Sequence, residues 1–89
     1  MSAHRFVVAV MPKAGILDPQ GRAVEQSLPH LDVSGVSDIR VGRRVELTVE
    51  ASDMLAARAI VERLAAEVFA NPIIETWEVS PASLVAAVR

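Results

Sequence analysis

Few side chains in this sequence could do chemistry, and their spacing assembles no catalytic centre. His4 and His30 have no companion at metal-ligand spacing, so surface positions suit both better than metal coordination. The serines fall at predicted turns and helix caps, with no histidine or aspartate partner placed beside them for nucleophilic catalysis. The chain has no cysteine. A thiolate nucleophile, a disulfide and a cysteine-based metal site are therefore excluded.

The glycines and paired carboxylates give no enzymatic motif either. Gly15 and Gly21 form neither G-x-G-x-x-G nor G-K-S/T, so no phosphate-binding loop is predicted. Glu46 and Glu50 share a strand face, where a solvated polar surface explains them better than an acid–base pair. We therefore expect no catalytic residue, and no metal or cofactor bound by this chain itself.

Two sets of charges remain to be placed. Glu75 lies between Ile73 and Trp77 on one strand parity, so it must be hydrogen-bonded, exposed at an edge or paired across an interface. A basic cluster surrounds a predicted turn and is well placed to meet a carboxylate, although such clusters are more often solvated. Its members are Arg40, Arg43 and Arg44.

The connector at residues 11–22 links the first predicted strand to the first predicted helix. Pro12 lacks a backbone donor and should end the strand. Asp18 followed by Pro19 is typical of a helix N-cap and first helical residue. Between them lie the cation Lys13 and the flexible joint Gly15. This connector is either a fixed structural corner or a surface that another molecule recognises.

The first half of the chain predicts a strand, a short helix and a hairpin. Residues 4–11 are apolar on both strand parities, as in a central strand covered on each side. The helix should stop near Pro29 and bury a stripe of Val24, Leu28 and Leu31. After a loop at residues 32–37, two antiparallel strands at 38–41 and 45–49 should meet at a turn of Gly42 and Arg43, with a single bent strand as the weaker alternative.

The second half predicts a longer helix and a last strand. Ser52 or Asp53 should cap the helix, and Asn71 before Pro72 should stop it. Its expected buried stripe comprises Ala57, Ile60, Val61, Leu64 and Val68. Residues 73–80 then have the pattern of a strand, and residues 81–89 that of a short terminal helix or tail.

These elements predict one α+β domain over residues 1–80. The order βαββαβ suggests a two-layer sandwich, with an antiparallel sheet and both helices on one face because crossovers are right-handed. The other face would then lack cover, although the first strand is apolar on both sides. An uncovered apolar face predicts self-association, as a dimer or larger, through the sheet.

Composition narrows the class of partner. The net charge of −2 and the pI near 5.6 argue against nucleic acid, which needs a basic face. No apolar run approaches the roughly 20 residues of a membrane span, and no signal-like segment opens the sequence. Together with the absence of cysteine, these features lead us to expect a cytoplasmic protein without a membrane partner.

Two motifs at a characteristic distance carry a resemblance to a known family. Residues 12–21 follow the pattern Pro-Lys-x-Gly-x-x-Asp-Pro-x-Gly, and residues 71–75 follow Asn-Pro-x-x-Glu. With residues 36–43 and 45–50 between them, the chain resembles the PurS family, the small subunit of phosphoribosylformylglycinamidine synthase. The resemblance covers residues 6–79. Pro29 and the tail after Ser80 depart from the family pattern.

The resemblance implies a non-catalytic bridging subunit in purine biosynthesis. Such a subunit dimerises, joins a glutaminase subunit to a large synthetase subunit, and helps to hand ammonia between them. The complex uses ATP, Mg and glutamine to convert formylglycinamide ribonucleotide to the amidine. The positions that match the family motifs, and are therefore candidate partner contacts, are Lys13, Asp18, Gly21, Arg40, Gly42, Asn71 and Glu75.

A regulatory module of the ACT-like kind is the alternative from another class. It shares the βαββαβ order and would bind a small molecule at a dimer interface. The glycine pattern of its ligand loop is not evident after the first predicted strand, which favours the PurS resemblance.

Overall fold

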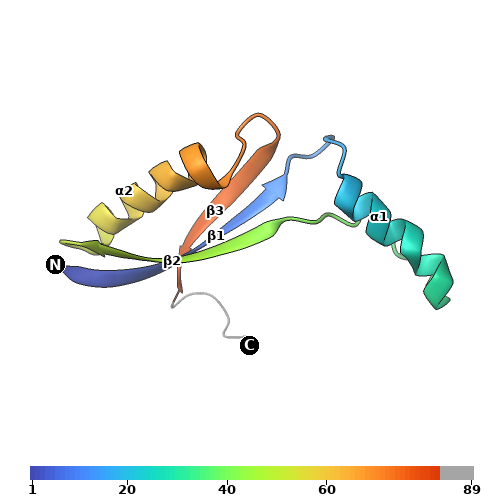
Figure 1. The fold of residues 1–89 in the computed structure, drawn as a ribbon, viewed down its shortest axis with the longest axis horizontal. Coiled ribbons are helices and arrows are strands. Elements are labelled where there is room, and N and C mark those ends of the chain that lie inside the picture. The colour runs from blue at the N-terminus through green and yellow to red at the C-terminus, as the bar shows by residue number, and fades with distance from the viewer. Residues whose placement is uncertain (83–89) are drawn as a thin grey trace.

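The fold of the chain is an antiparallel sheet with one helix packed on it and another extending from its end (Figure 1). The computed structural model describes residues 1–82. In chain order the elements are β1 (Ser2–Pro12), α1 (Pro19–Ser27) with a 3-10 turn (Leu28–Leu31), β2 (Arg43–Ala51), α2 (Met54–Leu64) with a π turn (Ala65–Phe69), and β3 (Glu75–Pro81). The strand order is β2-β1-β3. The predicted α+β class and antiparallel sheet are confirmed.

The core lies between the inner face of the sheet and α2. Val8 of β1 pairs with Val45 of β2 and Val79 of β3, so these three side chains share the inner face. Phe6, Val8 and Val10 are fully buried, as are three small residues of α2 and its extension, Ala57, Val61 and Ala65. Small side chains let the helix approach the sheet closely, and the aliphatic strands fill the layer between them.

The predicted hairpin is wrong: β2 is one strand, and residues 38–41 form none. The order is therefore βαβαβ instead of βαββαβ. Side-chain carboxylates take the place of a partner strand here, since Glu25 accepts from the Ile39 amide at 3.2 Å and Asp18 accepts from the Val41 amide at 2.8 Å. Asp38 also has a left-handed φ of 57°, which interrupts an extended conformation.

The prediction that both helices cover one face of the sheet is also wrong, because only α2 packs there. Helix α1 points away from the sheet end in Figure 1. Its predicted stripe is not buried: Val24 is 42% exposed and Leu31 is 68% exposed. The predicted end of the helix is confirmed, because α1 stops at Ser27 and a 3-10 turn containing Pro29 follows. The apolar side of α1 is therefore left partly exposed.

Helix α2 buries a narrower stripe than predicted. Of the two predicted caps, Ser52 and Asp53, the structure has Asp53, which accepts from the Ala56 amide at 2.8 Å. Ala57 and Val61 are buried, but Ile60 is 43% exposed and Val68 is 67% exposed. The π turn adds a residue to the last helical turn and rotates the end of the helix, so that Phe69 packs against the core in place of Val68.

The outer face of the sheet is only partly apolar. Val7, Ala9 and Met11 form a single apolar stripe along β1, and Val7 is buried. The flanking strands carry polar side chains on this face: Arg44, Glu46, Thr48, Glu50, Thr76 and Glu78. The uncovered apolar surface is therefore narrower than the sequence suggested.

The single chain is elongated. Its radius of gyration is 16.4 Å, whereas a compact chain of 89 residues would have a radius of gyration of about 12 Å. No helix among the described residues is long and apolar enough to cross a membrane. The last strand runs through Pro81, and the predicted helix or tail beyond it lies, from residue 83 onward, outside the described residues.

Candidate functional site

Asp18 joins the start of α1 to the segment that precedes β2. One carboxylate oxygen accepts from the Gly21 amide at 3.0 Å, as the predicted N-cap requires. The other accepts from the Val41 amide at 2.8 Å. These two hydrogen bonds, with a smaller contribution from Arg40, lower the pKa of the Asp18 carboxyl. Asp18 is thus both a helix cap and a tie between two chain segments.

Arg40 holds the other end of the connector. Its Nη2 donates to the carbonyl oxygens of Pro12 and Lys13, the latter at 2.8 Å. The backbone amide of Lys13 in turn donates to the Ile74 carbonyl at 2.8 Å. The backbone of Lys13 is therefore fixed from two sides. Its ammonium group makes no ion pair within residues 1–82.

Gly21 and Gly42 are positions where the backbone of another segment comes too close for a side chain. A Cβ atom on Gly42 would lie 2.1 Å from the Val10 carbonyl oxygen, and one on Gly21 would lie 2.1 Å from the Ile39 carbonyl oxygen. Neither glycine has a positive φ. Close approach therefore explains both residues, and their presence in the motif needs no partner.

Glu75 is held by an arginine and a backbone amide. Both of its oxygens accept from Arg43, each at 2.8 Å, and Oε1 also accepts from the Asn71 amide at 2.8 Å. The Arg43 guanidinium, followed by the Asn71 amide, lowers the pKa of the Glu75 carboxyl. Arg43 further donates to the Phe69 carbonyl at 2.5 Å. Of the three alternatives for Glu75, hydrogen bonding within the chain is the one observed.

Asn71 forms the turn between the π turn and β3. Its side-chain oxygen accepts from the Ile73 amide at 3.1 Å, and its carbonyl accepts from the Glu75 amide at 2.8 Å. An Asn side chain that bonds its own backbone two residues on is a common turn device. The residue therefore shapes the loop that presents Glu75 to Arg43.

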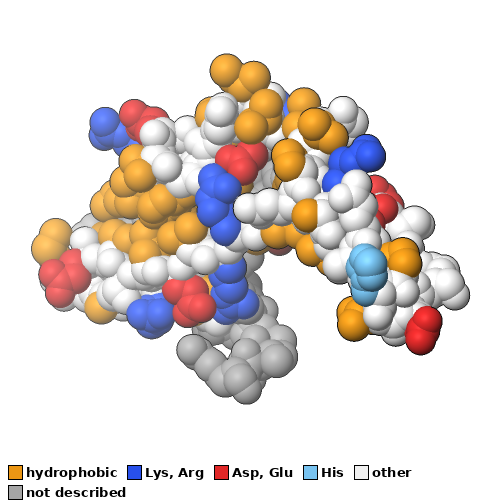
Figure 2. All heavy atoms as spheres, turned by 45° about the vertical axis from the view of Figure 1, so that its right-hand side comes forward, with side chains coloured by type: hydrophobic (Ala, Val, Ile, Leu, Met, Phe, Trp, Pro, Cys, Tyr) orange, Lys and Arg blue, Asp and Glu red, His pale blue; other side chains and the backbone are white. Residues whose placement is uncertain are grey.

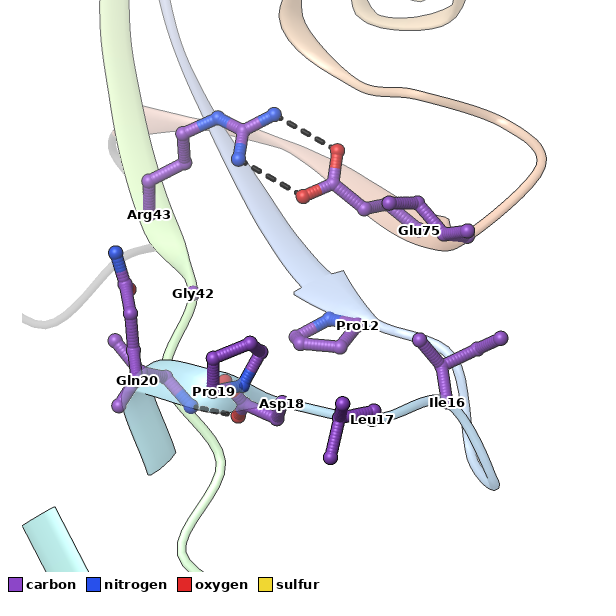
Figure 3. Close-up of a pocket in the computed structure, with 11 residues that line it drawn as sticks. Pro12, Ile16, Leu17, Asp18, Pro19, Gln20, Gly42, Arg43 and Glu75 are labelled. Atoms are coloured by element: carbon purple, nitrogen blue, oxygen red, sulfur yellow. Dashed lines mark hydrogen bonds and ion pairs between the residues drawn. The ribbon is translucent and has the colours of Figure 1, made fainter. Parts of the chain in front are cut away.

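These residues meet around one open pocket of about 490 Å³ at the end of the sheet (Figure 3). The Arg43–Glu75 pair lies along one side, with Gly42 and Pro12 below it in the view. The connector supplies the remaining wall through Ile16, Leu17, Asp18, Pro19 and Gln20. The walls are thus a fixed ion pair on one side and exposed apolar side chains on the other.

The structure brings five of the seven predicted site residues to or beside this pocket. Asp18, Gly42 and Glu75 line it, while Lys13 and Asn71 lie in the segments that border Glu75. Gly21 and Arg40 act behind it, at contacts between segments. The pairing of Arg43 with Glu75 was not predicted from the sequence. The signal was available: both residues fall on the parity of their strands that faces the core.

Within the described residues, most of the polar side chains of the site form hydrogen bonds with the chain itself. No group of three or more histidine, aspartate or glutamate side chains there is placed to hold a metal ion. The carboxylates with lowered pKa values, Asp18 and Glu75, are engaged by hydrogen bonds within the chain. The geometry provides a corner, fixed by hydrogen bonds, that can present exposed side chains to another molecule. Figure 2 shows hydrophobic and charged side chains next to one another on the surface of the molecule.

The two carboxylates predict acid sensitivity. Their pKa values are lower in the folded chain than in the unfolded one, so the native state binds fewer protons in acid. Their stabilisation is full above the unfolded pKa values, near pH 4, and is lost as the pH falls through the folded ones. As the pH falls from about 6 to about 3, the denaturant concentration at the unfolding midpoint should fall less for the double variant Asp18→Asn/Glu75→Gln than for the parent. If the parent and the double variant lose stability equally as the pH falls, other groups cause that loss.

Comparison with known proteins identifies relatives over nearly the whole chain. The profile of the family described as PurS, phosphoribosylformylglycinamidine (FGAM) synthase, matches residues 5–83. A curated FGAM synthase subunit PurS from Mycobacterium leprae is 40% identical, covering 85% of this chain and 92% of the relative. The Bacillus subtilis subunit of the same name is 34% identical, covering 93% and 98%.

A solved structure supports the same assignment. A chain in the structure of PurLQS from Thermotoga maritima superposes with a TM-score of 0.82 at 30% identity, covering 91% of this chain and 99% of that one. The family match at residues 5–83 spans both the connector and the Asn-Pro-x-x-Glu turn. The chain therefore belongs to the PurS family, whose members are subunits of FGAM synthase.

Proposed function

We propose that this chain is the bridging subunit of an FGAM synthase in purine biosynthesis, where it dimerises and joins a glutaminase subunit to a large synthetase subunit. The observation that carries the proposal is the superposition on a chain of the PurLQS structure, which covers 99% of that chain. A subunit of an equivalent assembly would match such a chain over its full length, as this one does.

The geometry supports a scaffold role in two ways. The connector is fixed by Asp18 and Arg40, so the side chain of Lys13 projects from a rigid backbone. The elongated chain also leaves large apolar side chains exposed on α1, α2 and the loops, among them Leu17, Leu31, Leu55 and Ile73. Exposed apolar side chains in this number are typical of a chain that is buried in an assembly.

In this proposal the chemistry resides in the other subunits. The complex uses ATP, Mg and glutamine in the cytoplasm, and this subunit helps to keep the ammonia released from glutamine from escaping before it reaches the synthetase site. Sealing and positioning need a well-placed surface and no nucleophile of the chain's own.

A reconstitution assay tests the proposal. With the glutaminase and synthetase subunits, glutamine-dependent amidine formation should require this chain and fall at least about tenfold without it. Ammonium salt in place of glutamine should remove most of that requirement, because no ammonia then has to pass between subunits. Equal glutamine-dependent rates with and without the chain would contradict the bridging role. Glutamine hydrolysis by the purified chain alone would contradict the scaffold assignment.

A further inference from the structure

Lys13 is the only lysine among the nine lysine and arginine residues of the chain. Its backbone is fixed, because its amide donates to the Ile74 carbonyl at 2.8 Å and its carbonyl accepts from Arg40 at 2.8 Å. The residue is half-buried, and its ammonium group makes no ion pair within residues 1–82. The corner therefore holds a cation in place without an opposite charge from the described part of the chain.

Two hollows meet beside this cation. The larger is the pocket of about 490 Å³ between the connector and the Arg43–Glu75 pair. The smaller, of about 320 Å³, is lined by Lys13, Pro72, Glu75, Thr76 and Trp77. Because Glu75 lines both hollows, they are adjacent and form one groove at the end of the sheet, which we call the corner groove.

The larger hollow is lined by apolar side chains that the chain leaves exposed. Leu17 is 68% exposed, Ile74 is 41% exposed and Ile16 is 38% exposed. Ile16 and Leu17 lie on the connector, below Glu75 in the view of Figure 3. Exposed apolar side chains gathered around a hollow are typical of a site where another molecule binds. An apolar side chain of that molecule would remove them from water, which stabilises a complex.

The other charged side chains of the corner are already engaged within the chain. Arg43 donates to both oxygens of Glu75 and to a backbone carbonyl, and Arg40 donates to two backbone carbonyls. Asp18 caps the start of α1, so the helix end does not offer that amide to an anion. A phosphate is usually bound by several cationic or N–H donors. A single ammonium group beside an apolar hollow suits one carboxylate better.

We propose that the corner groove binds a segment of a partner subunit in which an apolar side chain and a carboxylate are close in sequence. The apolar side chain fills the larger hollow beside Leu17, and the carboxylate pairs with Lys13. The inference rests on the proposed function and deepens it by naming the chemistry of the partner segment. Contact with the apolar walls supplies affinity, while the charge pair fixes the orientation of the segment. The apolar walls also strengthen the pair, because they exclude water from it.

Zero-length cross-linking tests the pair at Lys13. A carbodiimide joins an amine to a carboxylate that it already contacts, and mass spectrometry locates the new amide bond. In the complex reconstituted with the glutaminase and synthetase subunits, Lys13 should be linked to an aspartate or glutamate of one of them. That residue should have a large apolar residue within about two positions, so that both can reach the groove. Lys13→Arg keeps the charge but has no primary amine, so its complex should assemble without this link.

Replacing Leu17 with alanine tests the apolar hollow. The dissociation constant for the subunit that is linked to Lys13 should rise at least about tenfold in titration calorimetry. Leu31→Ala is the matched control, because Leu31 is also 68% exposed but lies in the 3-10 turn after α1, outside the corner groove. It should change the dissociation constant by less than about twofold. Equal losses of affinity in the two variants would overturn the assignment to the corner groove.

Competition with small anions separates a carboxylate from a phosphate as the partner of Lys13. In the free chain, inorganic phosphate and ATP should leave the rate of acetylation of Lys13 unchanged, because one ammonium group alone holds a phosphate weakly. The subunit that is linked to Lys13 should slow the acetylation. Protection of Lys13 by phosphate or ATP in the free chain would overturn the choice of a carboxylate.

The outcomes also separate this inference from the proposed function. If the complex forms amidine from glutamine but Lys13 is linked to no other subunit, the corner groove is not the binding site and the bridging role stands. A link from Lys13 to a second copy of this chain would likewise overturn the partner assignment. If no complex assembles, the proposed function and this inference both fail.

Discussion

Replacing Gly42 with alanine should destabilise the free chain by about 1–3 kcal/mol or more, because the added methyl group meets backbone atoms that cannot move aside. Its Cβ would lie 2.1 Å from the Val10 carbonyl oxygen and 2.3 Å from the Met11 sulfur. The Met11 side chain can rotate away, but Val10 is fixed in the central strand. In thermal unfolding, each loss of about 1 kcal/mol in the free energy of unfolding should lower the melting temperature by about 4–8 °C.

Gly21→Ala provides an independent version of the same test. Alanine favours a helix over glycine by about 1 kcal/mol, so intrinsic propensity alone predicts a gain in stability. We expect a loss instead, because the Cβ would lie 2.1 Å from the Ile39 carbonyl oxygen. Gly15→Ala is the control for crowding, since nothing lies within 4 Å of its Cβ and only its φ of 81° adds strain. If both Gly21→Ala and Gly42→Ala melt like the parent but assemble poorly, the two glycines are partner contacts instead.

Replacing Lys13 with alanine should leave the fold intact and weaken assembly with the other subunits by about 2–5 kcal/mol. The backbone of Lys13 is held by its hydrogen bonds to Ile74 and Arg40, and these do not depend on its side chain. The ammonium group makes no ion pair within residues 1–82, so its removal should cost the free chain little. On a partner, a carboxylate or phosphate left without its cation would account for the loss of affinity.

Two control variants make the Lys13 test specific. Lys13→Arg keeps the charge and should retain most of the affinity for the glutaminase and synthetase subunits. Asp18→Ala should lower the melting temperature first, since it removes the acceptor for both the Gly21 and Val41 amides. Titration calorimetry against each subunit gives the affinities. An unchanged affinity for both subunits in Lys13→Ala would show that the connector serves only the fold.

Local signals in the sequence were sufficient for the elements that depend on neighbouring residues. The N-cap at Asp18, the helix stop near Pro29 and a cap at Ser52 or Asp53 were predicted, because each is decided by backbone bonds within a few residues. The alternation of β2 correctly placed Val45, Leu47 and Val49 on the core face. The family motif at residues 12–21 likewise identified the connector, since that motif lies within a short run of residues.

Tertiary structure alone decided how distant segments meet. The periodicity of α1 predicted a buried stripe, but the carboxylate of Asp18 ties residue 41 to the start of α1, and the helix leaves the sheet. The hydrogen bond from the Val41 amide to Asp18 also takes the place of strand pairing at residues 38–41. Sequence separation hides such contacts: Arg43 and Glu75 are 32 residues apart, and their bidentate pair depends on how β2 and β3 flank β1. A pattern can show which side of a helix or strand is apolar. Only the packed chain shows whether that side meets its own sheet or is left for another subunit.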